Sequence, residues 1–450
     1  MRGRKVLLVN PWIHDFAAYD LWARPLGLLI VGSVVRRNGV EVSFIDCLGD
    51  DLASDRRPGG HGKFRRSTIE KPEPLGFVPR TYARYGIDPG EFARRLEEIP
   101  APDAVLVTSM MTYWYPGVRE AVGIVKDAFP GVPVILGGVY ATLCTDHARL
   151  ASGADYVVAG TGEARVIELL CSLWGCSAEY VPDEDDLDSL PYPAFDVMDN
   201  LDSVCVRTAR GCPYRCAYCA APVLSGSPSY RKTRAVIEEI LHWERSRGVK
   251  DVAFVDDALL TPRPRALEFL GGLASKSGDV RFHCPNALHA REISSEVARL
   301  MREAGFVTVR LGLETADAFR QRATGGKVTN DEYLWAVDAL VGAGYESRDI
   351  GVYVLCGLPD QEPEEVLDTV RFVLSSGATP LLAEYSPIPH TPLWDEAQKA
   401  SPYPISDEPL FHNNTILPCA QRRFLEVFPE IKRLALTGRR ASWTPCARDP

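Results

Sequence analysis

Three stretches near the start of the chain decide its fold class: VLLVN (residues 6–10), PLGLLIVGSVVRRN (25–38) and VEVSFID (40–46). The first and third are short runs rich in valine, isoleucine and leucine, which is typical of buried strands. The second has helical apolar spacing, begins at a proline and is followed by a glycine. A strand, a helix and a second strand in succession indicate parallel pairing through a right-handed crossover.

The same alternation continues to residue 175. Further strands are predicted at 104–109, 133–136 and 156–159, with helices at 116–129 and 142–152. Five such strands predict an open, doubly wound, flavodoxin-like parallel sheet, which binds ligands beyond the carboxyl ends of its strands. We therefore expect a first domain over residues 1–175.

Two stretches interrupt this alternation. Between residues 51 and 98, proline, glycine and arginine dominate, and so long an excursion predicts a functional cover rather than a plain loop. A solvated excursion is the alternative. Residues 176–203 contain the acidic run DEDDLD and then LPYPAFD, whose prolines predict an extended linker.

The alternation resumes at residue 204. Strands are predicted at 204–209, 251–255, 280–284, 307–312, 350–355 and 381–385. Six βα units predict a partial (βα)6 barrel of the TIM type over residues 204–394, with its site at the carboxyl ends of the strands. Residues 395–450 show no regular pattern, and we expect them to form an irregular C-terminal extension.

Composition excludes several classes of protein. With 450 residues, 46% apolar and 24% charged, the chain is neither disordered, collagen-like nor a coiled coil. The formal net charge of −10 argues against a dedicated nucleic-acid surface. No apolar run has the length of a bilayer span or the form of a secretory signal, so we expect a cytoplasmic protein. Twelve cysteines are too sparse for a disulfide scaffold, which makes any tight cysteine cluster a metal-site candidate.

Such a cluster occurs in GCPYRCAYCAAP (residues 211–222), where Cys212, Cys216 and Cys219 have the spacing C-x3-C-x2-C. A 4Fe–4S cluster normally takes four cysteines, so three would leave one iron open to a substrate or cofactor. A zinc site and three unliganded cysteines are the alternatives. Zinc sites usually combine two such motifs, and no second pair is evident, since Cys171 and Cys176 are weak candidates.

This loop is similar to the signature of the radical S-adenosylmethionine (SAM) enzymes, C-x3-C-x-aromatic-C, with Tyr218 in the aromatic position. The resemblance covers approximately residues 204–394. It implies a 4Fe–4S cluster on the three cysteines, with SAM chelating the open iron. It also implies a 5′-deoxyadenosyl radical formed on reduction, and a low-potential electron donor of the flavodoxin or ferredoxin type as a partner.

Residues near the ends of the barrel strands agree with this resemblance, which implies that they contact SAM. They are Asp256, Asn286, Arg310, Glu314, Gly357 and Ile388. A structural salt bridge is the alternative for Glu314, and either Asp256 or its neighbour Asp257 could face the substrate instead. We expect His283 and His289 to be structural residues rather than ligands.

The first domain resembles the cobalamin-binding domain that precedes many radical SAM enzymes. The segments LGGVYAT (136–142) and VVAGTGE (157–163) are similar to that family's loops after the fourth and fifth strands. The resemblance implies that cobalamin contacts Gly137, Gly138, Thr142, Gly160 and Gly162.

One departure from the cobalamin-binding pattern concerns the cobalt ligand. The chain has no D-x-H-x-x-G motif, and neither His14 nor His147 falls in that spacing, so we expect no protein histidine on cobalt. A degenerate domain that binds nothing is the alternative. The aromatic run Tyr113, Trp114 and Tyr115 is expected either to cap a corrin face or to pack against the barrel.

These features favour a cobalamin-dependent radical SAM methyltransferase acting on an unactivated carbon or, less often, phosphorus. A second hypothesis is a non-methylating radical SAM enzyme that catalyses rearrangement, cyclisation or carbon–carbon bond formation. A third is an iron–sulfur electron-transfer or sensor protein, for which a closed four-cysteine site would be better suited than this loop. The sequence does not indicate the substrate.

Overall fold

The computed structural model describes residues 1–22, 24–49, 61–199, 201–276 and 278–443. The chain divides into two compact units. The first comprises Met1–Cys205, Val223–Arg231 and Ile405–His412, and the second comprises Val206–Pro222, Lys232–Pro404 and Asn413–Pro450. The segments Val223–Arg231 and Ile405–His412 therefore belong to the first unit, although they follow the rest of that unit in the chain.

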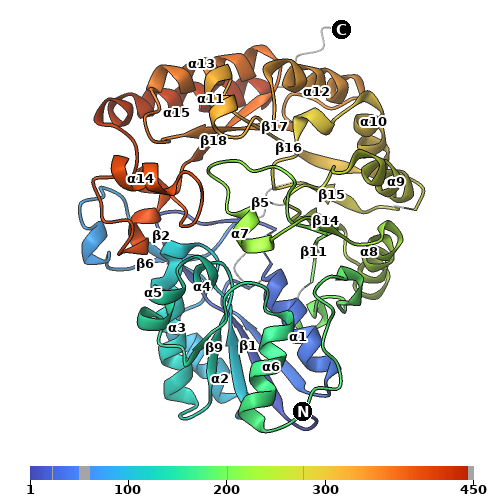
Figure 1. Cartoon of the computed structure of the whole chain (residues 1–450), viewed down its shortest axis with the longest axis vertical. Coiled ribbons are helices and arrows are strands. Elements are labelled where there is room, and N and C mark those ends of the chain that lie inside the picture. The colour runs from blue at the N-terminus through green and yellow to red at the C-terminus, as the bar shows by residue number, and fades with distance from the viewer. Residues whose placement is uncertain (23, 50–60, 200, 277, 444–450) are drawn as a thin grey trace. The chain divides into compact units, whose positions relative to one another are not determined.

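A five-stranded parallel sheet forms the centre of the first unit. Its strands are β1 (Lys5–Asn10), β4 (Glu41–Asp46), β8 (Ala104–Val107), β9 (Val134–Leu136) and β10 (Tyr156–Val157). Their order is β10-β9-β8-β1-β4, so the direction of winding reverses beside β1 (Figure 1). This is the doubly wound, flavodoxin-like sheet that the sequence predicts, and ligands bind near such a reversal.

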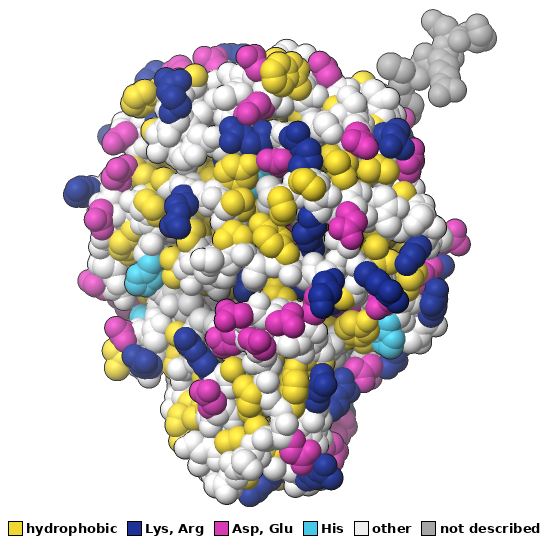
Figure 2. Space-filling model, turned by 45° about the vertical axis from the view of Figure 1, so that its right-hand side comes forward, with side chains coloured by type: hydrophobic (Ala, Val, Ile, Leu, Met, Phe, Trp, Pro, Cys, Tyr) yellow, Lys and Arg dark blue, Asp and Glu magenta, His cyan; other side chains and the backbone are white. Residues whose placement is uncertain are grey.

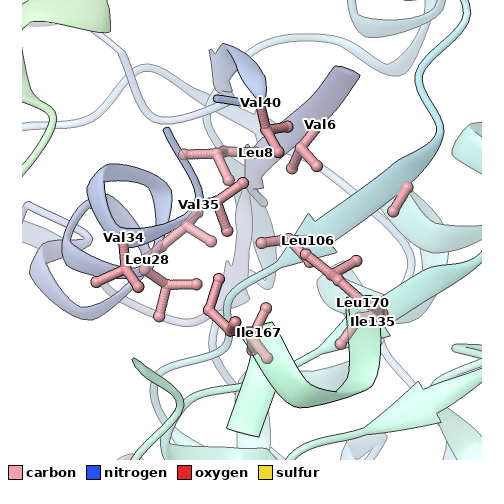
Figure 3. Packing of buried hydrophobic residues seen from close by; sticks show 13 residues of the cluster. Val6, Leu8, Leu28, Val34, Val35, Val40, Leu106, Ile135, Ile167 and Leu170 are labelled. Atoms are coloured by element: carbon pink, nitrogen blue, oxygen red, sulfur yellow. The ribbon is translucent and has the colours of Figure 1, made fainter. Parts of the chain in front are cut away.

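Helices connect these strands, and two of them enclose a core with the sheet. They are α1 (Leu26–Arg37), α2 (Pro89–Glu97), α3 (Tyr115–Ala128), α4 (Val139–Leu143), α5 (Thr145–Ala151) and α6 (Glu163–Trp174). Leu28 and Val34 of α1, Ile167 of α6 and Leu106 of β8 belong to one buried cluster (Figure 3). The apolar stripe of α1 recurs at helical spacing, which is why this segment forms a helix against a sheet.

Short antiparallel strands accompany the main sheet. They are β2 (Ile13–Asp15), β3 (Tyr19–Leu21), β5 (His61–Lys63), β6 (Arg66–Thr68) and β7 (Ala83–Tyr85). β7 pairs with β2 and β6, and β3 pairs with β5. Part of the excursion between residues 51 and 98 is therefore regular, although residues 50–60 lie outside the described part. Strands of three residues are too short to show an alternating pattern in the sequence.

A six-stranded sheet forms the centre of the second unit. Its strands are β11 (Ser203–Val206), β14 (Asp251–Phe254), β15 (Arg281–His283), β16 (Phe306–Glu314), β17 (Ile350–Cys356) and β18 (Thr379–Glu384). They lie side by side in chain order, with β11 and β18 at the edges. This is the partial (βα)6 barrel that the sequence predicts.

Helices follow the strands of this sheet and cover its outer side (Figure 1). They are α8 (Thr233–Arg247), α9 (Arg263–Ala274), α10 (Ser295–Ala304), α11 (Ala318–Ala323), α12 (Asn330–Gly342) and α13 (Pro363–Ser375). Stacked phenylalanines from neighbouring strands fill part of the core, with the rings of Phe254, Phe282 and Phe306 within 5.6 Å of one another. Two short elements of this unit are β12 (Ala209–Arg210) and η6 (Ala290–Glu292). Two more, α7 (Ala221–Ser225) and β13 (Ser229–Tyr230), lie wholly or mostly in the segment Val223–Arg231 of the first unit.

The C-terminal part of the chain corrects an expectation. Instead of an irregular extension, it forms α14 (Trp394–Ala400), η7 (Pro409–His412), η8 (Asn414–Ile416) and the 22-residue helix α15 (Arg422–Trp443). Pro429 inside α15 hides the helical pattern, yet Phe424, Phe428, Ile431 and Ala435 are buried at helical spacing. Residues 444–450 lie outside the described part.

In the described part of the predicted linker (176–199 and 201–203), two single-turn helices occur, η4 (Leu187–Ser189) and η5 (Phe195–Val197), and β11 begins at Ser203. Within the described residues, the search for a helix long and apolar enough to cross a membrane finds none. Figure 2 shows basic and acidic side chains interspersed on the face that it presents.

Candidate functional site

The three cysteines lie in the loop between β12 and α7, and backbone hydrogen bonds fix this loop. Cys219 N–H donates to the Cys216 carbonyl at 3.1 Å, and Ala221 N–H donates to the Cys219 sulfur at 3.4 Å. Ala217 N–H donates to the carbonyl of Thr324 at 3.0 Å. The loop is therefore tied to the segment that follows α11.

Gly325 in that segment allows an unusually close approach. Its φ is 118°, and a Cβ built there would lie 3.0 Å from both the Cys216 Cα and the Arg215 carbonyl oxygen. Glycine adopts positive φ without a steric penalty and leaves the necessary room. The loop after β18 also holds the cysteines in place, because Leu393 N–H donates to the Ala217 carbonyl at 2.9 Å.

The thiols lie near enough to influence one another. Burial is the main reason that the pKa of Cys212 rises to about 11, and charge on Cys216 and Cys219 adds to the rise. Burial also raises the pKa of Cys219. Neighbouring thiols that resist ionisation become thiolate ligands when a cationic group stabilises them, and this donor set fits an iron–sulfur cluster.

Among the described residues, no three His, Cys, Asp or Glu side chains are grouped closely enough to hold one metal ion.

A partly buried ion pair lies beside the loop. Lys327 Nζ donates to Glu314 Oε1 at 2.5 Å, and both side chains are 13% exposed. Although burial lowers it, the pKa of Lys327 is raised overall by charge on Glu314, Cys216 and Cys219. The ammonium also lies 5.8 Å from the ring centre of Tyr218. The structure thus contains the salt bridge that was the alternative interpretation of Glu314. Contact between Glu314 and SAM stays a prediction.

The two aspartates after β14 hold the chain that leads into the cysteine loop. Asp256 Oδ1 accepts from Thr208 N–H at 2.9 Å, from the Thr208 hydroxyl at 2.8 Å and from Ala209 N–H at 2.7 Å. Asp257 accepts from Gly211 N–H at 3.1 Å. Asp256 is 3% exposed, and burial raises its pKa to about 6. These contacts position the loop, and contact between Asp256 and SAM stays a prediction.

The other residues expected near SAM are distributed along the same sheet. Asn286 follows β15 and donates from Nδ2 to the Asp256 carbonyl at 3.2 Å. Gly357 follows β17 with φ of 85°, and Ile388 lies in the loop after β18. Arg310 lies in the middle of β16 rather than at its end. Three of these four residues therefore lie beyond a strand end, and the contacts of all four with SAM stay predictions.

In the first unit, the structure brings the expected cobalamin residues together. Gly138 has φ of 98°, and a Cβ there would lie 2.2 Å from a carbonyl oxygen of the loop after β8, so only glycine fits. The Thr142 hydroxyl donates to the Gly138 carbonyl at 2.8 Å and accepts from Gly160 N–H at 2.9 Å. Gly137 directly follows β9, and Gly162 directly precedes α6. Thr142 therefore joins two loops at the carboxyl edge of the sheet.

The aromatic run after β8 is packed within the first unit. Tyr113 and Tyr115 are buried, and Trp114 donates from Nε1 to Asp15 Oδ2 at 2.7 Å. The Tyr115 hydroxyl donates to Glu408 at 3.1 Å. A role for these rings in capping a corrin face stays a prediction.

Both histidines considered as cobalt ligands have protein partners. His14 Nε2 lies 3.2 Å from Glu120, and His147 Nδ1 lies 2.7 Å from the Tyr140 hydroxyl. Burial lowers the pKa of His147. The absence of a protein histidine on cobalt stays a prediction.

Two features carry no prediction from the sequence, namely Lys327 and the segment Ile405–His412. The run Gly325, Gly326 and Lys327 follows Glu314, which ends a strand, and a lysine after two glycines could have indicated this position. The segment Ile405–His412 gives no local signal, because its role depends on contacts such as that between the Thr112 hydroxyl and His412 Nδ1 at 2.8 Å.

Two family profiles match this chain. The profile described as the radical SAM superfamily matches residues 206–373, which contain the cysteine loop. The profile described as the B12 binding domain matches residues 81–170, which contain both glycine loops of the first unit.

Individual relatives agree with these profiles. An uncharacterized methyltransferase of Pyrococcus horikoshii is 26% identical over 479 aligned residues, which cover 98% of this chain and 91% of that protein. The hopanoid C-2 methylase of Rhodopseudomonas palustris is 28% identical over 291 residues, which cover 60% of this chain and 53% of that enzyme.

The fold has a solved counterpart. The radical SAM methyltransferase TsrM from Kitasatospora setae, solved with tryptophan substrate and a SAM analog, matches with a TM-score of 0.69 at 17% identity. The match covers 98% of this chain and 89% of TsrM. At this identity the likeness concerns the fold.

The two domains define the cofactors. The radical SAM domain uses a 4Fe–4S cluster and SAM and needs a reductant, and the B12 binding domain uses cobalamin. The chain therefore combines a domain that matches the radical SAM superfamily with a domain that matches the B12 binding family, and the two relatives above are a methyltransferase and a methylase by name.

Proposed function

We propose that this enzyme transfers a methyl group from SAM to an unactivated carbon of its substrate. The observation that carries the proposal is the presence, in one chain, of a three-cysteine loop beside a partly buried cation and of a glycine-lined ligand edge on a doubly wound sheet. When bound, cobalamin carries the methyl group, and the cluster with SAM supplies the radical that removes hydrogen from the substrate.

The second unit would bind the cluster and SAM. Cys212, Cys216 and Cys219 would hold the cluster, while the ammonium of Lys327 places a positive charge beside it. SAM would bind at the carboxyl ends of the barrel strands, where its contacts are proposed to be Tyr218, Asp256, Asn286, Arg310, Glu314, Gly357 and Ile388.

The first unit would bind cobalamin at its carboxyl edge. Gly137, Gly138, Gly160 and Gly162 would let the backbone approach the ligand closely, and Thr142 holds their loops together. We propose the domain limits 1–175 for this domain, 176–203 for the linker, 204–394 for the radical SAM domain and 395–450 for the C-terminal extension. We also propose that a protein of the flavodoxin or ferredoxin type supplies the electrons.

Two products of SAM test the reaction. Methyl donation converts one SAM to S-adenosylhomocysteine, whereas reductive cleavage of a second SAM yields methionine and 5′-deoxyadenosine, which carries the abstracted hydrogen. The reconstituted enzyme is incubated anaerobically with methyl-deuterated SAM, cobalamin, a chemical reductant and a small-molecule extract as the source of substrate. We expect both products and a deuterated methyl group in a compound of the extract.

Variants and alternatives give distinct outcomes. Replacing all three cysteines with alanine should abolish 5′-deoxyadenosine, because its formation needs the cluster. Formation of 5′-deoxyadenosine without S-adenosylhomocysteine would replace the proposal with a non-methylating radical enzyme. Formation of neither compound would favour an iron–sulfur electron-transfer or sensor protein.

A further inference from the structure

His289 lies beside a cysteine of the cluster loop. Its Nε2 is 3.8 Å from the sulfur of Cys212, which is within reach of an N–H···S hydrogen bond. The side chain is 7% exposed, so water does not compete freely for this contact.

The position of His289 is fixed by the backbone before it. Leu288 N–H donates to the Arg310 carbonyl at 2.7 Å, and Gly312 N–H donates to the Leu288 carbonyl at 3.1 Å. His289 then directly precedes η6. Because the preceding residue is hydrogen-bonded to β16, the imidazole is carried by a rigid element of the barrel rather than by a free loop.

The ring is also held by a neighbour from the cysteine loop. The rings of Tyr214 and His289 are stacked, with centres 4.5 Å apart and planes 25° apart. The Tyr214 hydroxyl donates to Glu292 at 3.0 Å, and the Arg291 guanidinium lies 5.6 Å from the Tyr214 ring centre. Tyr214 is therefore itself restrained, and it limits rotation of the imidazole.

The two ring nitrogens have different surroundings, and this decides which one carries the proton. Nδ1 is buried and has no hydrogen-bond partner among the described residues. A cysteine that ligates iron is a thiolate, which can accept a hydrogen bond but cannot donate one. The proton of a neutral ring therefore belongs on Nε2, where it points at the Cys212 sulfur.

We propose that His289 tunes the 4Fe–4S cluster by donating an Nε2–H···S hydrogen bond to Cys212, which makes it a positioning and tuning residue for the radical reaction. The inference rests on the proposed cluster at Cys212, Cys216 and Cys219. Hydrogen bonds to cluster sulfurs help to set reduction potentials, and outer-shell partners of ligands tune metal sites. The bond is stronger when the cluster holds an extra electron, so it favours the reduced state.

The test measures the reduction potential of the cluster, with three variants chosen to separate the donor from the packing. His289→Phe keeps an aromatic ring against Tyr214 but removes the N–H donor. His289→Gln restores a side-chain N–H donor without the ring. Tyr214→Phe is the matched control, because it keeps the stacked ring and removes only the hydroxyl that donates to Glu292. Iron content and the visible spectrum are measured first in each protein.

The reduction potential of the cluster is measured by an anaerobic redox titration of the reconstituted full chain, with electron paramagnetic resonance to detect the reduced cluster. At a fixed applied potential, His289→Phe should lower the ratio of reduced to oxidised cluster by about tenfold, which corresponds to a fall of about 59 mV in a one-electron potential. His289→Gln should lie closer to the wild type, and Tyr214→Phe should be unchanged. Equal potentials for wild type and His289→Phe, or equal shifts in His289→Phe and His289→Gln, would overturn the inference.

A second measurement does not depend on any variant assembling its cluster. In the reduced wild-type protein labelled with ¹⁵N-histidine, electron–nuclear double resonance should detect a coupled histidine nitrogen and an exchangeable proton. Absence of both couplings would contradict the hydrogen bond even though a cluster is present. A wild-type protein that assembles no cluster would instead contradict the proposed function, so the two failures are distinguishable.

Discussion

Glu314 and Lys327 illustrate how single side chains shape the surroundings of the cysteine loop. Two buried charges are tolerated when they are in contact, but removing one partner typically costs about 3–5 kcal/mol because the other charge stays uncompensated. Glu314 also has φ of 68°, a conformation that costs a non-glycine residue about 1–3 kcal/mol. Strain of this kind is typical of functional sites, where the surrounding structure holds a residue in place.

The cysteines carry the first prediction at this scale. Anaerobic reconstitution should give about four irons and four sulfides per chain, as expected for a cubane. Replacing Cys212, Cys216 and Cys219 together with alanine should abolish the brown chromophore, because no thiolate then remains to hold the iron. Iron and sulfide analysis measures the loss, with Cys171→Ala as the control. A triple variant that keeps a full cluster would show that the ligand assignment is wrong.

Glu314 carries the second prediction. Glu314→Ala should weaken SAM binding by about 10- to 150-fold, since loss of a hydrogen bond to a charged group costs about 1.5–3 kcal/mol. The iron content should stay unchanged. Equilibrium dialysis with SAM measures the affinity, and the double variant Glu314→Ala/Lys327→Met separates the two effects. If the double variant binds SAM as tightly as wild type, the uncompensated charge of Lys327 caused the loss, and Glu314 is a structural residue.

At the scale of elements, two C-terminal segments extend the two units. The helix α15 packs on α13 and β18 of the second unit, and its buried face is formed by Phe424, Phe428, Ile431 and Ala435. The segment Ile405–His412 instead belongs to the first unit, where it contacts Thr112 and Tyr115. Both segments lie beyond the six βα units, yet both bury side chains in a core.

The helix α15 should contribute directly to stability. Phe424→Ala should lower the free energy of unfolding by about 3–5 kcal/mol, because a fully buried phenylalanine loses its apolar contacts and leaves a cavity. Urea unfolding followed by circular dichroism measures the change. The matched control is Leu436→Ala on the same helix, where the side chain is 55% exposed and truncation should have little effect. Equal losses in the two variants would contradict this packing.

His412 in η7 makes the first unit sensitive to acid. Burial lowers its pKa to about 4, below the ordinary value of about 6.5. Between these values the unfolded chain binds a proton that the folded chain does not, so stability falls as the pH falls, by up to about 1.4 kcal/mol per pH unit. His412→Gln should reduce the difference in urea midpoint between pH 7.0 and 5.5, whereas the exposed His242→Gln should not. An unchanged difference in His412→Gln would refute this assignment.

At the scale of the whole molecule, two parallel sheets each present a ligand edge at the carboxyl ends of their strands. In the first, Thr142 joins the loops of Gly138 and Gly160. In the second, the cysteine loop is hydrogen-bonded to segments that follow α11 and β18. A cofactor that carries a methyl group and a cofactor that generates a radical thus have separate binding domains in one chain.

Cobalamin bound to this enzyme should lack a protein histidine on cobalt. His14 and His147 already contact Glu120 and the Tyr140 hydroxyl, and the chain has no D-x-H-x-x-G motif. We expect a base-off absorption spectrum after anaerobic expression with excess corrinoid, and the same spectrum in His14→Gln and His147→Gln. A base-on spectrum that disappears in one variant would identify that histidine as a ligand. Failure to retain corrinoid would favour the non-methylating alternative.

The sequence by itself determined the elements of the two sheets and the spacing of the cysteines. Runs such as residues 6–10 and 350–355 form strands because they are rich in apolar residues and are bounded by turn-forming residues, both of which are local features of the sequence. The C-x3-C-x2-C spacing is also local, because it lies within one loop. Gly138 was expected from the resemblance to the cobalamin-binding domain, whereas its close approach to the loop after β8 depends on the tertiary structure.

Only the tertiary structure decided which side chains meet. The pairs Glu314 with Lys327, Cys212 with His289 and Thr112 with His412 join residues that are 13, 77 and 300 positions apart. Apolar periodicity does not encode such contacts, because it specifies which face of an element is buried and not which polar group lies opposite. The three-residue strands β2, β6 and β7 depend on their partners in the same way, since strands this short are stable only when paired.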